Sequence, residues 1–244
     1  SGGFGWQDRI VVKARHAVKL DREFLSSPIT HTAAIGVLGI PGLTAYFGLL
    51  ELGELEKDQT VLISSASGPV GATAGQIARI HGARAVGLAG SQIKIDWLTK
   101  DAGFDSVVNY KECGDLSEAI HDACPDGIDI YLDNVGGEML DAAIENMKPH
   151  GRIIVSGQLA EYNRTEPRGI RNTLTFITHR LRMEGFVVLD YAPQFREAQV
   201  ALAQWIRSGE VIYREEIIED IKNAPEAFTG LFRGDNFGRR IIAV

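Results

Sequence analysis

The stretch TVLISSASGPVG, residues 60–71, contains the pattern from which the fold of this chain is predicted. Its first five residues are mostly apolar or β-branched, which is typical of a buried strand. Small residues then form a turn, and residues 71–81 carry apolar side chains at helical spacing until Gly82, a common helix stop. A second apolar run follows at residues 85–89. The stretch therefore predicts a strand, a helix and a second, parallel strand.

Within this turn, Ala66, Gly68 and Gly71 form an A-x-G-x-x-G variant of the dinucleotide-binding fingerprint. A small residue at 66 permits the tight turn, and Gly68 lets the backbone approach a pyrophosphate. Gly71 lets the helix pack closely on the strand, while Pro69 suits the first helical turn. The helix N-terminus would offer N–H groups and partial positive charge to the phosphates. Glycine-rich turns also occur for purely structural reasons, but the flanking strands and helix favour a dinucleotide site.

Outward from this unit, the chain alternates between short apolar runs and amphipathic segments. Strands are predicted at residues 106–109, 128–133, 152–156 and 186–189, and helices at 93–102, 116–123, 139–147 and 194–208. Another helix is predicted at residues 42–52, just after Pro41. Strands that are apolar throughout are buried on both faces, which predicts an α/β fold with a doubly wound parallel sheet of the Rossmann type.

The two ends of the chain are less regular. Residues 9–12 and 17–20 are predicted as short strands or extended segments. Residues 167–178, which follow closely on Arg164, are predicted as an irregular, basic surface loop or lid. After Gly209, strands at 211–218 and 239–244 flank a helix at 223–232. This arrangement indicates a second module.

The overall charge and composition argue against several classes of function. The chain of 244 residues has a formal net charge of -7, which argues against nucleic-acid binding through phosphate neutralisation. No apolar run reaches the roughly 18 residues that a membrane span requires, and the first eight residues do not resemble a signal peptide. Cys113 and Cys124 are the only cysteines. They lack metal-ligand spacing and are predicted to be reduced thiols of a cytoplasmic protein.

The end of the second strand predicts which nicotinamide cofactor is bound. NAD enzymes commonly place Asp or Glu there to bind the ribose hydroxyls, whereas this chain has Ala89, Gly90 and Ser91. Without a carboxylate, a 2′-phosphate meets no repulsion, and Ser91 and Lys94 can bind it through charge-assisted hydrogen bonds. Asp96 is predicted to point along the helix. A lysine taken alone is more often simply solvated, but the missing carboxylate together with Ser91 and Lys94 predicts NADPH.

Two further strand ends carry polar groups at the same edge of the predicted sheet. Ligands of doubly wound sheets bind at the carboxyl ends of strands, where Asn134 and the pair Ser156 and Gly157 lie. Asn134 either binds the ribose or nicotinamide side of the cofactor or caps the turn that follows it. The chain has no His or Cys cluster with zinc spacing, no Tyr-x-x-x-Lys pair and no G-x-S-x-G elbow. These absences favour a zinc-free reductase over short-chain dehydrogenase or hydrolase chemistry.

Six segments together resemble one family: IPGLTAY at 40–46, SSASGPVG at 64–71, DNVGG at 133–137, EYNRT at 161–165, RMEGFVV at 182–188 and GDNFG at 234–238. From about residue 5 onward the chain resembles the zinc-independent medium-chain dehydrogenases/reductases, in the group of prostaglandin, alkenal/one and curcumin reductases. The resemblance implies NADPH-dependent reduction of the carbon–carbon double bond of an α,β-unsaturated ketone or aldehyde. No metal is required if hydrogen bonds polarise the carbonyl oxygen.

The resemblance also implies roles for individual residues. Tyr162 is the candidate catalytic residue, in contact with the enone oxygen or the ribose. Lys94 and Tyr110 would lie near the adenosine phosphate, and Asn236 would close over the nicotinamide. The cofactor-binding residues implied in this way are Gly68, Pro69, Val70, Gly71, Lys94, Tyr110, Asn134, Ser156, Gly157, Tyr162, Phe186, Val187, Val188 and Asn236.

The family further implies a division of the chain into a partial GroES-like catalytic domain (1–41), an NADPH-binding Rossmann domain (42–208) and a return to the catalytic domain (209–244). Family members begin with a full barrel-like catalytic domain, most of which has no counterpart here. If the chain is complete as given, NADPH binding survives while turnover is lost, because water exclusion and substrate orientation suffer. A non-catalytic NADPH-binding module and a quinone reductase are therefore the alternatives. A homodimer through edge strands, with residues 186–189 as the candidate, is also expected.

Overall fold

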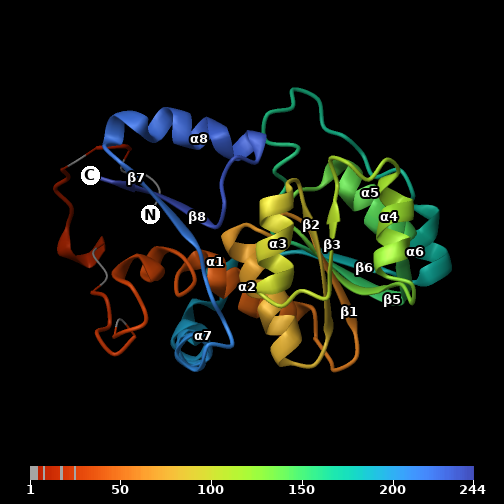
Figure 1. The fold of residues 1–244 in the computed structure, drawn as a ribbon, viewed down its shortest axis with the longest axis horizontal. Coiled ribbons are helices and arrows are strands. Elements are labelled where there is room, and N and C mark those ends of the chain that lie inside the picture. The colour runs from red at the N-terminus through yellow and green to blue at the C-terminus, as the bar shows by residue number, and fades with distance from the viewer. Residues whose placement is uncertain (1–4, 8, 17–18, 25) are drawn as a thin grey trace.

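The computed structural model describes residues 5–7, 9–16, 19–24 and 26–244, and its centre is a six-stranded parallel sheet (Figure 1). The strand order is β3-β2-β1-β4-β5-β6. The strands are β1 (Thr60–Ile63), β2 (Arg84–Ala89), β3 (Ser106–Asn109), β4 (Ile128–Asp133), β5 (Met147–Val155) and β6 (Arg182–Gly185). The order reverses between β1 and β4, as it does in doubly wound Rossmann sheets. The predicted fold class is confirmed.

Helices cover both faces of this sheet, because successive side chains of a strand point to opposite sides. Val61 and Ile63 of β1 share one core cluster with residues of α1 (Ile40–Phe47), α2 (Pro69–Ile80), α3 (Gln92–Lys100) and α7 (Phe195–Ser208). Leu62, between them, shares the other cluster with residues of α4 (Leu116–Ala123), α5 (Gly137–Glu145) and α6 (Leu174–His179). Burial on both faces explains why this strand is apolar throughout.

Most predicted elements are confirmed to within a few residues. The helix predicted at 42–52 is α1 followed by a π-helical segment at Gly48–Leu52. Helix α2 starts at Pro69, where the missing N–H costs no helical hydrogen bond. Helix α4 starts after Asp115, whose carboxylate accepts a hydrogen bond from the N–H of Glu118 at 3.0 Å.

A smaller sheet stands beside the first one (Figure 1). Its strands β7 (Glu215–Glu219) and β8 (Arg239–Ala243) pair in parallel and are connected through α8 (Ala224–Arg233). The buried amide of Gln76 on α2 binds the segment that leads into β7, donating to the carbonyl of Ile212 at 2.9 Å and accepting from its N–H at 2.8 Å. Phe237 packs edge-on against Trp97 of α3. The C-terminal segment therefore forms a separate small sheet that is fixed against α2 and α3.

The strand predicted at residues 186–189 is wrong. The edge strand β6 lies earlier, at Arg182–Gly185, and Val188–Gln194 forms a 3-10 helix. Val188 is buried against α1 and α7, whereas Val187 is 60% exposed. The apolar run thus packs against helices, and backbone pairing with β5 decides where the strand lies. The tendency of a residue to form a strand depends on these tertiary surroundings, so the apolar pattern alone did not locate the edge strand.

Two predictions for irregular regions are also corrected. No strand forms at residues 9–12, and none at 19–20, while residues 17–18 lie outside the described residues. The segment predicted as irregular at 167–178 ends in helix α6. Its first part is anchored, because the guanidinium of Arg168 pairs with Asp141 of α5 at 2.7 Å.

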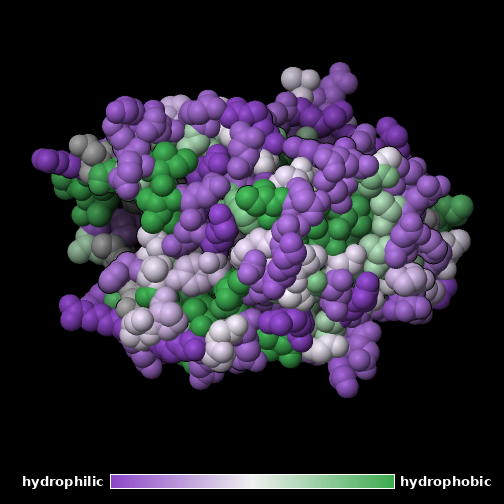
Figure 2. Space-filling model, in the orientation of Figure 1, coloured by the Kyte–Doolittle hydropathy of each residue, from purple (hydrophilic) through white to green (hydrophobic). Residues whose placement is uncertain are grey.

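The face of the molecule in Figure 2 is mostly hydrophilic, and apolar side chains gather at the end where the N-terminal segment lies. Trp6 and Val11 of that segment are exposed. Among the described residues, no helix combines the length and the apolar character needed to cross a bilayer.

Candidate functional site

The turn between β1 and α2 brings backbone against backbone at Gly71. A Cβ atom on Gly71 would lie 2.5 Å from the carbonyl oxygen of Ser65 and 2.7 Å from the Cα of Ala66. Neither atom can move aside without opening the turn, so this position requires glycine. A Cβ on Gly68, the residue before α2, would have only the two oxygens of Ser65 within 4 Å, each at 3.2 Å. A side chain at Gly68 would therefore crowd only the turn itself.

A cavity of about 290 Å³ opens beside this turn, over the carboxyl ends of β1, β2, β3 and β4. One wall is formed by the turn and the sheet, with Ser67, Gly90 and Tyr110. The opposite wall is formed by the C-terminal module, with Gly234 and Asn236. The N–H of Gly238 donates to the carbonyl of Ser67 at 2.9 Å and connects the two walls. Doubly wound sheets bind ligands in the crevice at this reversal of strand order.

Basic side chains line this cavity, and no Asp or Glu is among the described residues that do so. The basic residues are Lys94, Lys111 and Arg233. Burial, and after it the like charge of Lys111, lowers the pKa of Lys94. The ammonium of Lys94 donates to the carbonyl of Gly234 at 2.5 Å. An ammonium carries three N–H donors, so Lys94 retains donors for an anion.

Tyr110 forms the part of the cavity that lies over Gly90. A Cβ on Gly90 would lie 2.8 Å from the Tyr110 hydroxyl, so a side chain at residue 90 would displace the tyrosine. Burial raises the pKa of Tyr110, which keeps its hydroxyl neutral and able to donate. Asp96 lies on the outer surface of α3, where it accepts from Gln92 and pairs with Lys100. Its predicted direction along the helix is confirmed.

These residues fit the predicted nucleotide. The glycine turn and the first turn of α2 suit a pyrophosphate, and the carboxylate-free basic wall suits an additional phosphate group. A ribose diol held by a carboxylate, the arrangement typical of NAD, has no such partner among the residues that the structure describes at this wall. Within the described residues, no group of three or more His, Cys, Asp or Glu side chains is placed to hold a metal ion.

The side chain of Asn134 is engaged by the protein itself. Its Nδ2 donates to the carbonyl of Ser64 at 2.8 Å, and its Oδ1 accepts from the hydroxyl of Ser156 at 2.7 Å. Asn134 thus connects the ends of β1, β4 and β5. Of its two predicted roles, this geometry favours the structural one, and contact with the cofactor stays a prediction. Gly157 also lies here, with its N–H bonded to the carbonyl of Asp133 at 3.1 Å.

The residues predicted at the nicotinamide end are not brought together in this cavity. Tyr162 is 63% exposed, and its hydroxyl accepts a hydrogen bond from the N–H of Gln158 at 3.3 Å. Phe186 packs against Gly48, where a Cβ would lie 3.3 Å from its ring. Val187 and Val188 point to solvent and to the core respectively. Asn236 does line the cavity, and its amide donates to the carbonyl of Gly238 at 3.2 Å.

The sequence patterns missed two of the basic residues. Lys111 directly follows Tyr110 at the end of β3, so attention to every strand end would have found it. Arg233 ends α8, far along the chain from the glycine turn, and no local pattern connects it to this site. It also pairs with Glu226 of α8 and with Asp235, which lies just after the helix.

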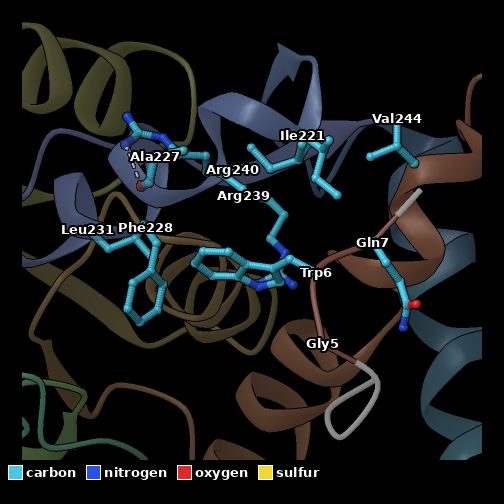
Figure 3. Close-up of a pocket in the computed structure, with 12 residues that line it drawn as sticks. Gly5, Trp6, Gln7, Ile221, Ala227, Phe228, Leu231, Arg239, Arg240 and Val244 are labelled. Carbon is cyan, nitrogen blue, oxygen red and sulfur yellow. Dashed lines mark hydrogen bonds between the residues drawn. The ribbon is translucent and has the colours of Figure 1, made fainter. Parts of the chain in front are cut away.

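A larger cavity, of about 410 Å³, lies away from the sheet between the N-terminal segment and the C-terminal module (Figure 3). Trp6 and Phe228 pack edge to face in it, and Arg239 reaches it from β8. Among the described residues that line it, none ends a strand of the six-stranded sheet and none belongs to the turn at residues 64–71. It combines the aromatic rings of Trp6 and Phe228 with Arg239 and Arg240, away from the strand ends where a doubly wound sheet binds a dinucleotide.

Comparisons with known proteins show the family of this chain. Residues 69–205 match a family model described as zinc-binding dehydrogenase. The 2-alkenal reductase (NADP(+)-dependent) of Nicotiana tabacum is 46% identical over 209 residues, which cover 86% of this chain and 61% of that protein. The NADPH-dependent curcumin reductase of Escherichia coli is 40% identical over 249 residues, which cover 100% of this chain and 71% of that protein.

Solved structures show the same fold. CurA from Vibrio vulnificus, solved in complex with NADPH, matches with a TM-score of 0.84 and 33% sequence identity. The match covers 90% of this chain and 67% of that one. The chain thus spans 61% of the tobacco protein and 71% of the Escherichia coli protein.

Proposed function

Because the chain belongs to the zinc-binding dehydrogenase family, in the medium-chain group that contains alkenal, curcumin and prostaglandin reductases, we propose that it binds NADPH and reduces the carbon–carbon double bond of α,β-unsaturated ketones or aldehydes. One observation carries this proposal. The turn after β1 borders, through Ser65 and Ser67, a basic cavity at the reversal of strand order, and no Asp or Glu is among the described residues that line it. The names of the relatives support the same reaction class.

The chain's own residues would bind the two charged ends of the cofactor. The turn Gly68–Gly71 and the N-terminus of α2 would receive the pyrophosphate through backbone N–H groups. The 2′-phosphate would be bound by Lys94, Lys111 and the Tyr110 hydroxyl, which line the same cavity beside Gly90. When bound, NADPH supplies the hydride that, together with one proton, saturates the double bond.

Tyr162 is the proposed donor to the substrate. Its phenol oxygen accepts from the N–H of Gln158, which leaves its own O–H free to donate. A donor aimed at the carbonyl oxygen of an enone stabilises the negative charge that develops there during reduction. Because the Tyr162 side chain is exposed, a ligand that enters beside residues 158–160 can reach it.

Turnover is tested by following NADPH oxidation with a medium-chain enal, an aryl enone and a quinone. We expect oxidation with the enal or the enone, because only these present a polarised double bond beside a single carbonyl acceptor. Activity with the quinone alone would refute the substrate class. Tight NADPH binding without turnover of any of them would instead indicate a non-catalytic binding module.

We also propose that the chain forms a homodimer through its β6 edge. In the part of the chain that the structure describes, this strand has no partner on its outer side, and neighbouring Ile177, Val187 and Leu189 are exposed apolar residues. Exposed edges and apolar patches of this kind mark association surfaces. This replaces the 186–189 strand with β6 as the pairing element.

The dimer predicts the behaviour of a charged substitution at this edge. Leu189→Glu should shift the protein from dimer to monomer, because a buried unpaired carboxylate opposes association. Ile93→Glu, at an equally exposed site on α3, is the matched control and should leave the molar mass unchanged. Light scattering over a concentration series measures both. A wild-type protein that is monomeric throughout would contradict the dimer.

The division of the chain into 1–41, 42–208 and 209–244 is proposed on the same basis. It is supported by α1, which starts at Ile40, and by α7, which ends at Ser208. A cytoplasmic location is proposed from the two free thiols, Cys113 and Cys124.

A further inference from the structure

Asp133, the last residue of β4, is a fully buried carboxyl group at the edge where the cofactor is proposed to bind. No cation pairs with it among the residues that the structure describes. Burying a carboxylate without compensation is strongly unfavourable. Burial accordingly raises the pKa of Asp133, and the N–H groups of Gly136 and Val135 oppose this rise. The group must therefore be held by hydrogen bonds.

Five donors converge on this carboxyl group. Oδ1 accepts from the hydroxyls of Ser64 at 3.1 Å and Tyr131 at 2.9 Å. It also accepts from the N–H groups of Val135 at 3.0 Å and Gly136 at 2.8 Å. Oδ2 accepts from Nε2 of Gln158 at 3.3 Å. The backbone N–H groups can only donate, so Asp133 is held as an acceptor.

Apart from Tyr131, which lies within β4, these donors follow the ends of three separate strands. Ser64 follows β1 and starts the glycine turn, and its hydroxyl also accepts from the N–H of Asn134 at 2.8 Å. Val135 and Gly136 form the loop after β4. Gln158 belongs to the segment after β5, and its side chain lies across Gly136, where a Cβ would come within 2.5 Å of it. Asp133 thus connects the loops on both sides of the reversal of strand order.

The connection extends to the substrate side through Gln158. Its side chain is bonded to Asp133, and its backbone N–H is bonded to the Tyr162 hydroxyl. The carbonyl of Asp133 accepts in addition from the N–H groups of Ser156 and Gly157, at 2.8 and 3.1 Å. The segment that leads to Tyr162 is therefore held to Asp133 by both backbone and side chain.

We propose that Asp133 is a positioning residue of the cofactor site, a role that rests on the proposed function: its carboxylate holds Ser64, the 134–136 loop and Gln158 in the one arrangement that receives NADPH and places Tyr162. It touches neither cofactor nor substrate itself. An asparagine lacks the negative charge, keeps only one of the two acceptor oxygens and presents an NH₂ group to Gln158, so it should hold these donors more weakly.

The test compares Asp133→Asn with Asp129→Asn. Asp129 lies at the other end of the same strand, where its carboxylate accepts from the N–H of Thr60 and from Lys148, each at 2.8 Å. Both variants lose a carboxylate from β4, but only Asp133→Asn should loosen the carboxyl edge. We expect amide hydrogen exchange at residues 134–137 and 156–160 to accelerate roughly ten-fold in Asp133→Asn, with a similar loss of NADPH affinity by fluorescence titration.

Asp129→Asn should change neither measurement at those segments. Equal exchange at 134–137 and 156–160 in the two variants, or exchange in Asp133→Asn like that of the wild type, would overturn the proposal. Adding Gln158→Glu to Asp133→Asn should restore protection at 156–160, because a carboxylate offers only acceptors and pairs with the new NH₂ group whichever way it turns. A failure of this rescue would also count against it.

Two further outcomes are distinguishable. If Asp133→Asn does not fold, Gln158→Met removes a single donor from the network, and faster exchange confined to residues 156–162 supports the proposal, whereas no change overturns it. If the wild-type protein binds no NADPH, the proposed function fails. The exchange measurements then still decide whether Asp133 orders the loops.

Discussion

Gly71→Ala is expected to abolish NADPH binding and to lower the free energy of unfolding by about 3 kcal/mol. The added Cβ would lie 2.5 Å from the carbonyl oxygen of Ser65 and 2.7 Å from the Cα of Ala66. Because both are backbone atoms, α2 must move away from β1 to admit it. That movement displaces the helix N-terminus from the place where the pyrophosphate would bind. Urea unfolding and NADPH fluorescence titration measure the two effects.

Variants of two other glycines separate an effect on NADPH binding from an effect on stability. Gly169→Ala is the matched control, because its Cβ would meet nothing within 4 Å among the described atoms and its φ is not positive. Both measurements should stay at wild-type values. Gly68→Ala should lose more in affinity than in stability, since its Cβ meets only the oxygens of Ser65, at 3.2 Å, within the turn that is proposed to receive the pyrophosphate. NADPH binding by Gly71→Ala at wild-type affinity would refute the pyrophosphate site.

Lys94→Ala is expected to weaken NADPH binding by roughly 10- to 100-fold while NADH binding changes little. A hydrogen bond from an ammonium to a phosphate is among the stronger ones in proteins, and only NADPH carries the 2′-phosphate. The same cavity holds Lys111 and Arg233, which retain part of the attraction in the variant. Titrations with both cofactors at two ionic strengths check the result, since salt weakens the phosphate contact.

The control for this variant lies on the same helix. Lys100→Ala removes a lysine that is exposed and paired with Asp96 at 2.9 Å, so neither cofactor should be affected. Lys94 also donates to the carbonyl of Gly234, and its loss can loosen the segment that carries Asn236. Equal losses for NADPH and NADH would therefore mean that Lys94 positions this segment and does not recognise the 2′-phosphate.

Residue patterns predicted the local elements well, because local interactions produce them. The glycine turn is one example: Gly71 contacts Ser65 and Ala66, its near neighbours in the chain. The absence of an acidic residue after β2 is likewise visible in the sequence, and the structure shows no carboxylate at the described wall of the cavity. The strand predicted at residues 186–189 was wrong for a non-local reason, because pairing with β5 selected Arg182–Gly185 as the edge strand.

By itself, the sequence determined the alternation of strands and helices, the turn that suits a pyrophosphate and the position of Lys94, because each depends on residues close together in the chain. Only the tertiary structure decided how the polar groups at the carboxyl edge are used. Asn134 is occupied by Ser64 and Ser156, and Asp133 is reached by Gln158. Whether two residues far apart in the chain form a hydrogen bond depends on the order and register in which their strands pair. Local residue type and spacing do not reveal that order or register.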